Sequence, residues 1–142
     1  PRWVIGTRFT AGSIMTSDGS IPDEAKIPPD WLFLAGGDRD LRGFERNSLP
    51  NKERGSGSVL TAGIESRWPG LFSFPLEPLL FTDFGYLGNG NFRWESPLHL
   101  SPGFGFRSAT PLGTVRGTLA RGMVPSIGLK RWQLFFSFGT EF

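Results

Sequence analysis

The sequence predicts an all-β protein, specifically part of an antiparallel transmembrane β-barrel. About six segments alternate apolar and polar residues with the period of a β-strand. The 20 Gly and 12 Pro interrupt the chain too often for long helices. No stretch approaches the roughly 18–20 apolar residues that a membrane helix needs. Barrel strands alternate their apolar residues, so a hydrophobic content of 38% is compatible with a membrane location.

We expect the first three strands over residues 3–13, 58–68 and 79–87. In the first, Trp3 and Phe9 face away from Arg8. In the second and third, the face with the charged residues carries Glu65 and Asp83, and the opposite face is apolar. A barrel places the apolar face outside and the polar face inside. A soluble β-sandwich would show the same alternation, so the pattern alone leaves both folds open.

The last three strands are expected over residues 99–108, about 114–123 and 131–142. In the fourth strand, two Phe residues lie on the face opposite Arg107, and in the fifth, Leu119 lies on the face opposite Arg116. The last strand ends in an aromatic residue, and its apolar face holds Leu134, Phe136, Phe138 and Phe142. A final strand of this kind is typical of a barrel wall, and we interpret these four residues as a terminal strand signal.

The connections between the expected strands alternate in length. Residues 14–57, 88–98 and 124–131 connect strands at one end, and a medium connection over residues 69–78 and a tight one over residues 109–113 connect them at the other. If the C-terminus lies on the periplasmic side, residues 14–57, 88–98 and 124–131 are extracellular. Aromatic residues near the strand ends fit interfacial girdles: Trp3, Trp68, Tyr86, Trp94 and Trp132.

Composition argues against several other classes of function. The absence of Cys excludes disulfides and thiolate metal sites, and no other residue cluster has metal-ligand spacing. The net charge is only +2 and the charged residues are interspersed along the chain, which suggests no nucleic-acid surface. A Ser-His-Asp triad would need His99, the only His, which we expect at the surface. We therefore expect no cofactor, no metal and no catalytic residue. The chain opens at Pro1 without an initiator Met, so we interpret it as part of a longer protein.

The loop over residues 14–57 has an unusual composition for a surface connection. Residues 31–34 read Trp-Leu-Phe-Leu, and Arg42 is flanked by Leu41, Gly43 and Phe44. Surface loops are usually rich in small polar residues because they face water. This composition indicates a loop that folds back into a partly closed space, which in a barrel is the lumen.

Four sequence motifs resemble those of one family, and they occur in the family's order. The segment from Gly36-Gly37 through Leu41-Arg42-Gly43-Phe44 resembles the signature GG-x-x-x-[VIL]-R-G-[FY]. Residues 63–65 resemble a G-x-E strand, and Phe81, Asp83 and Gly85 an F-x-D-x-G strand. Residues 105–116 resemble a G-x-R-x-x-[ST]-P-x-G-x-x-R hairpin. The family is the outer membrane protein assembly and two-partner secretion barrel superfamily, with its BamA-like, TamA-like and FhaC-like members, also called the bacterial surface antigen family.

This resemblance implies a role for Arg42. Glu65 and Asp83 are expected on the lumen faces of adjacent strands, where their like charges repel. An inserted Arg42 would relieve that repulsion by charge-assisted, bidentate bonding, and Gly43 would allow close backbone approach. In the alternative, Glu65 pairs with Arg67 or Arg107, Asp83 pairs with Arg116, and Arg42 is solvated. Spacing alone favours this alternative, whereas the resemblance favours pairing of Arg42 with the two carboxylates.

The resemblance also implies an architecture and an activity. The complete barrel would have about sixteen strands, with this chain as its C-terminal portion and periplasmic POTRA domains upstream. Such proteins insert or export β-rich clients through a lateral seam between first and last strands, and they make or break no bond. Implied partners are outer-membrane lipid, client barrels or secreted proteins, and periplasmic or inner-membrane assembly factors. The alternatives are a passive outer-membrane pore or receptor, and the membrane anchor of a fused enzyme such as a patatin-like lipase.

Overall fold

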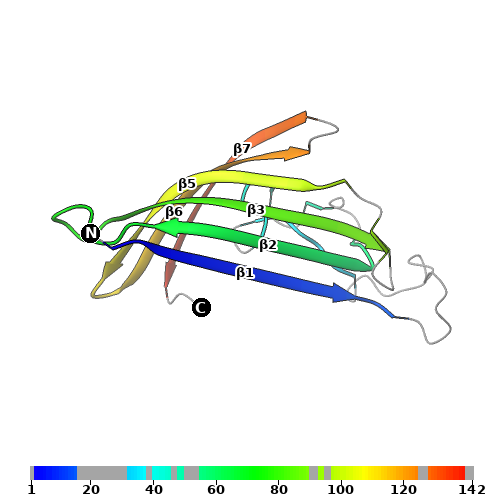
Figure 1. Ribbon diagram of the computed structural model, residues 1–142, viewed down its shortest axis with the longest axis horizontal. Coiled ribbons are helices and arrows are strands. Elements are labelled where there is room, and N and C mark those ends of the chain that lie inside the picture. Colours follow the sequence, from blue (N-terminus) through cyan, green and yellow to red (C-terminus); the bar gives the residue numbers. More distant parts are fainter. Residues whose placement is uncertain are drawn as a thin grey trace.

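The computed structural model is one antiparallel β-sheet (Figure 1). It describes residues 2–15, 32–37, 40–45, 48–49, 55–89, 93–94, 97–124 and 128–139. The strands are β1 (Val4–Ser13), β2 (Ser58–Arg67), β3 (Glu77–Asn89), β4 (Arg93–Trp94), β5 (His99–Thr110), β6 (Gly113–Val124) and β7 (Gly128–Gly139). They are ordered β1-β2-β3-β5-β6-β7, and the short β4 pairs with β3. The all-β, antiparallel prediction is therefore confirmed. In these ranges we find no helix long and apolar enough to cross a membrane.

The strand boundaries differ from the expected ones mainly at one end of the sheet. The interval 88–98 was expected to be only a connection, but β3 continues to Asn89 and pairs there with β4. The prediction of a connection over all of residues 124–131 was also wrong. Because Met123 pairs with Leu129 and Val124 with Gly128, only three residues separate β6 from β7. The final residues, Phe142 among them, lie outside the described residues.

The two faces of the sheet have opposite chemistry. Large apolar side chains are exposed on one face, for example Phe9 at 70%, Phe136 at 67% and Phe138 at 64%. The other face buries polar groups such as Asp83 and Thr61. The sheet curls, so that β6 and β7 pass behind β1 to β3 (Figure 1). Among the described residues it is open between β1 and β7, which are its two edges. The curled sheet with an apolar face and a polar inner face is a segment of barrel wall.

A loop segment packs onto the inner face near one end of the strands. We call this the loop end, where β1, β3 and β6 finish and β2, β5 and β7 begin. Residues of the 32–49 segment share one buried apolar cluster with strand residues of the inner face: Ala35, Leu41, Phe44, Leu49, Val59, Leu87 and Val124. Backbone bridges Phe33–Ser56 and Ala35–Leu49 fix the segment's shape. The apolar residues of the loop therefore have a core of their own, built against β2, β3 and β6.

Candidate functional site

The loop presents Arg42 through a short, tightly bonded turn. The Phe44 N–H donates to the Leu41 carbonyl at 3.0 Å, which closes a turn around Arg42 and Gly43. Asp40 fixes the preceding residues because its Oδ1 accepts from the N–H groups of Leu41 at 2.5 Å and Gly36 at 3.0 Å. Gly36 has φ +111°, and a Cβ there would also collide with the Glu45 carbonyl. A glycine is therefore required at this bend.

The Arg42 side chain is 2% exposed and binds two carboxylates of the inner face. Its Nε and Nη2 donate to the two carboxylate oxygens of Asp83, both at 2.8 Å, and its backbone N–H donates to Asp83 Oδ2 at 3.1 Å. Its Nη1 donates to Glu65 Oε2 at 2.6 Å. The guanidinium carbon lies 3.5 Å from the centroid of the Phe81 ring. The bidentate, charge-assisted geometry is among the strongest available to two side chains.

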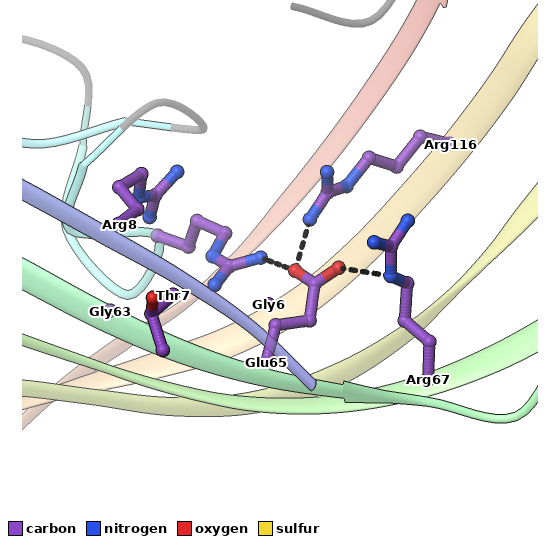
Figure 2. Close-up of a pocket in the computed structure, with 8 residues that line it drawn as sticks. Gly6, Thr7, Arg8, Gly63, Glu65, Arg67 and Arg116 are labelled. Atoms are coloured by element: carbon purple, nitrogen blue, oxygen red, sulfur yellow. Dashed lines mark hydrogen bonds and ion pairs between the residues drawn. The ribbon is translucent and has the colours of Figure 1, made fainter. Parts of the chain in front are cut away.

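Glu65 joins this pair to two further arginines of the wall. Arg116 of β6 donates to Glu65 Oε2, and Arg67 Nε lies 3.6 Å from Glu65 Oε1. Figure 2 shows the carboxylate of Glu65 between Arg116 and Arg67, with Arg8 on the opposite side of the cavity. The cavity has a volume of about 300 Å³ and is lined by Arg8, Arg42, Arg67 and Arg116, with Glu65 among them. The inner face where the loop attaches therefore carries a network of arginines and carboxylates.

Arg8 of β1 is a second link between wall and loop. Its Nη2 donates to Asp83 Oδ1 at 3.1 Å and to the backbone carbonyl of Asp40 at 2.9 Å. The strand register places Gly63 directly between Arg8 and Asp83. A Cβ at Gly63 would lie 2.7 Å from Asp83 Oδ1 and 3.4 Å from Arg8 Nε. The missing side chain at Gly63 thus allows Arg8 to reach across β2 to Asp83.

The three motif residues of β3, which are Phe81, Asp83 and Gly85, all contact the loop motif. Phe81 stacks on Arg42, Asp83 binds it, and Gly85 makes room for Leu41, whose Cδ1 would be 2.6 Å from an added Cβ. The loop motif and the strand motif are therefore complementary surfaces of one contact. The model of one protein family, the Omp85 superfamily domain, matches residues 1–142. The chain belongs to the Omp85 superfamily. This is a family of outer-membrane β-barrels that act in outer-membrane protein assembly and secretion, and its domains are generally non-enzymatic.

The ionisation of the Omp85 loop follows from its contacts. Burial lowers the pKa of Arg42, but the hydrogen bonds and charges of Asp83 and Glu65 outweigh it, so the pKa lies above its ordinary value. Arg42 is therefore permanently charged. Burial raises the pKa of Asp40, while the backbone N–H groups of Leu41 and Gly36 and the charge of Arg8 oppose the rise only in part. Ionised Asp40 thus carries a desolvation cost in the folded loop.

The structure brings together all the residues that the sequence linked to Arg42, and it adds others. Glu65 does contact Arg67, as in the alternative pairing, but it holds Arg42 as well. Arg116 was considered as a partner of Asp83 and contacts Glu65 instead. Arg8 and Asp40 were missed. The signal for Arg8 was its place on the charged face of the first strand, but its partner follows only from the strand register.

His99 is not the surface residue that we expected. It is 7% exposed because Phe44 of the loop covers it, with ring centroids 5.4 Å apart in an edge-to-face contact. In the Omp85 chain, His99 is therefore part of the wall surface on which the loop motif packs. Among the described residues, no group of three or more His, Asp or Glu side chains is placed to hold a metal.

Proposed function

We propose that this chain is the C-terminal portion of an Omp85 factor that inserts or exports β-rich client proteins. In this proposal the 14–57 loop is extracellular and folds into the lumen, and the protein is not an enzyme. The observation that carries the proposal is the fixed attachment of Arg42 to Asp83 and Glu65 on two neighbouring strands. A passive pore needs no such buried attachment, because an unoccupied lumen conducts as well.

The attachment links the loop to the shape of the wall. Arg42 joins β2 to β3 through their carboxylates, and Glu65 extends the contact to Arg116 of β6. Arg8 adds β1 to the same network. Four strands are thus connected through one loop residue and its two acids. Such a brace would hold the wall in a defined curvature while the terminal strand β7 and the missing first strand separate to accept a client strand.

The experiment uses the full-length protein in liposomes and follows the folding of a small outer-membrane barrel supplied unfolded. Arg42→Ala leaves Asp83 buried without its main partner, a loss of roughly 3–5 kcal/mol for a buried pair. We expect client folding to slow at least tenfold, with partial recovery in Arg42→Lys, which restores charge but not the bidentate geometry. Arg42→Asp combined with Asp83→Arg should also recover part of the activity.

Arg107→Ala is the matched control. Arg107 lies on the same inner face and pairs with Glu77 at 3.1 Å, away from the loop. It should leave client folding within about twofold of wild type. Equal activity of Arg42→Ala and wild type, with both barrels folded, would reject the brace and favour a pore or an enzyme anchor.

A further inference from the structure

The basic residue Arg121 lies on the apolar outer face, where many of the exposed side chains of the described wall are large and apolar. Alternate residues of β6 point inward and are buried, including Thr118, Ala120 and Val124. Arg121 lies between them and is paired across the ladder with the exposed Trp132 of β7. An arginine in a lipid-facing wall is costly at the bilayer centre and tolerated near an interface. Arg121 is the fourth residue from the loop end of a 12-residue strand, so it lies toward one interface.

The guanidinium of Arg121 is held in place but not saturated. Its Nε donates to the backbone carbonyl of Lys130 at 2.8 Å, and its central carbon lies 5.7 Å from the Trp132 ring centroid. Within the described part of the chain, its two Nη groups have no acceptor. Their N–H fork matches the oxygens of a phosphate group. The side chain is therefore oriented in advance, with donors left over for a ligand.

An apolar groove of about 320 Å³ adjoins this guanidinium. Besides Arg121, its lining is apolar and comes from three strands: Pro102, Gly103, Phe104, Met123, Leu129 and Trp132. The groove lies where both ladders of β6 are irregular. The pairing of β5 with β6 passes from Leu100–Met123 to Gly103–Ala120 without pairs between, and a bulge interrupts β6–β7 beside Arg121. Pro102 has no N–H to donate, which explains the first interruption.

We propose that this site binds a membrane lipid with an anionic phosphate headgroup. Arg121 takes the phosphate through its Nη groups, one acyl chain occupies the groove, and Trp132 lies at the interface. The neighbouring Lys130 and Arg131 are exposed and add positive potential, which favours an anionic over a zwitterionic headgroup. Free phosphate could not use the apolar groove. The proposal rests on the membrane placement of the family and not on the loop brace, so either can fail alone.

Native mass spectrometry of the full-length protein tests the site. The protein is released from vesicles containing equal amounts of dioleoylphosphatidylglycerol and dioleoylphosphatidylcholine, and retained lipids are counted. Wild type should retain the phosphatidylglycerol preferentially, and Arg121→Gln should lower its apparent affinity roughly tenfold. Met123→Trp, which fills the groove and leaves the charge, should also lower it. Inorganic phosphate at millimolar concentration should not displace the lipid.

Arg2→Gln is the matched control, because Arg2 is an exposed cation at the other end of the wall. It should retain phosphatidylglycerol like wild type. Folding of each variant is checked by heat-modifiable gel mobility, and Arg121→Lys provides a second charged variant if Arg121→Gln does not fold. Equal retention by wild type and folded Arg121→Gln, or displacement by inorganic phosphate alone, would overturn the lipid site.

Discussion

Gly43 of the loop and Gly122 of β6 meet backbone to backbone. A Cβ added to Gly122 would lie 2.6 Å from the Gly43 carbonyl oxygen and 2.9 Å from the Phe44 ring, and one added to Gly43 would collide with the Gly122 backbone. The loop can therefore sit this deep only because both residues lack a side chain. The salt bridges of Arg42 and the burial of Phe44 depend on that depth.

We predict that Gly122→Ala lifts the loop motif away from the wall. The added methyl group should cost about 1–3 kcal/mol, the usual range for overpacking a tight contact. Limited proteolysis of the full-length protein should cleave the 14–57 loop faster than in wild type. Gly6→Ala is the control, because its Cβ would meet nothing closer than Arg67 at 3.9 Å. Unchanged cleavage in Gly122→Ala would show that the Gly43–Gly122 contact does not hold the loop.

We predict that Arg8→Ala weakens the loop less than Arg42→Ala does. Arg8 is partly exposed, at 25% for its side chain, and Asp83 keeps its two bonds from the Arg42 side chain when Arg8 is lost. A loss of about 1 kcal/mol is expected for a partly exposed pair. The midpoint of thermal unfolding, followed by gel mobility, should rank wild type above Arg8→Ala, and Arg8→Ala above Arg42→Ala. Reversal of the two variants would contradict the assignment of Arg42 as the main link.

We predict that Asp40→Asn removes one acid-dependent contribution to loop stability. Because the folded pKa of Asp40 is raised by burial, its protonated form favours the folded loop, and that contribution is lost as the pH rises through the folded pKa. Wild-type loop protection against proteolysis, taken relative to that of Asp40→Asn, should therefore increase as the pH falls toward the folded pKa of Asp40. Asn keeps an acceptor for the N–H groups of Gly36 and Leu41 without the charge, and the other titrating groups are the same in both proteins. A relative protection that decreases as the pH falls would contradict the prediction.

Alternation was sufficient to predict an antiparallel sheet with one apolar and one polar face, whereas the family resemblance was needed to choose a barrel over a sandwich. Trp3, Phe9 and Leu134 share the exposed face because the period of a strand is two residues, whatever the strand's neighbours. The positions at which β6 ends and β7 begins were harder to predict from the sequence. The run from Val124 to Leu129 contains no residue pattern that distinguishes a short turn from a long loop, and only cross-strand pairing decides it.

Predicting the contacts of the site required the pairing register of the strands, which could not be deduced from the sequence. The carboxylates of Glu65 and Asp83 could be assigned to one face, but the contact of Arg8 with Asp83 requires Gly63 to lie exactly between them. The contact of Arg116 with Glu65 requires the sheet to curl, since the two lie on strands that are not neighbours. The burial of His99 needs the loop to be in place. Periodicity finds a face, whereas curvature and loop docking determine the partners on it.

We predict that β7 is the moving side of a lateral seam. Its outer face keeps Leu134, Phe136 and Phe138 exposed, and its free edge has no partner among the described residues. Unpaired backbone groups cost several kcal/mol each in lipid, so we expect a short, transient pairing of β7 with the first strand of the complete barrel.

A disulfide between a cysteine at Ser137 and one opposite it on that first strand should block the folding of an added client barrel while leaving the protein folded. The control is a disulfide between Thr118→Cys and Phe135→Cys, which joins β6 to β7 at a pair that is already continuous. That control should leave client folding unchanged, because β6 and β7 move together when the seam opens. If the seam-locked protein still folds its client at the full rate, clients do not enter between the first and last strands, and a passive pore or an enzyme anchor explains the barrel better.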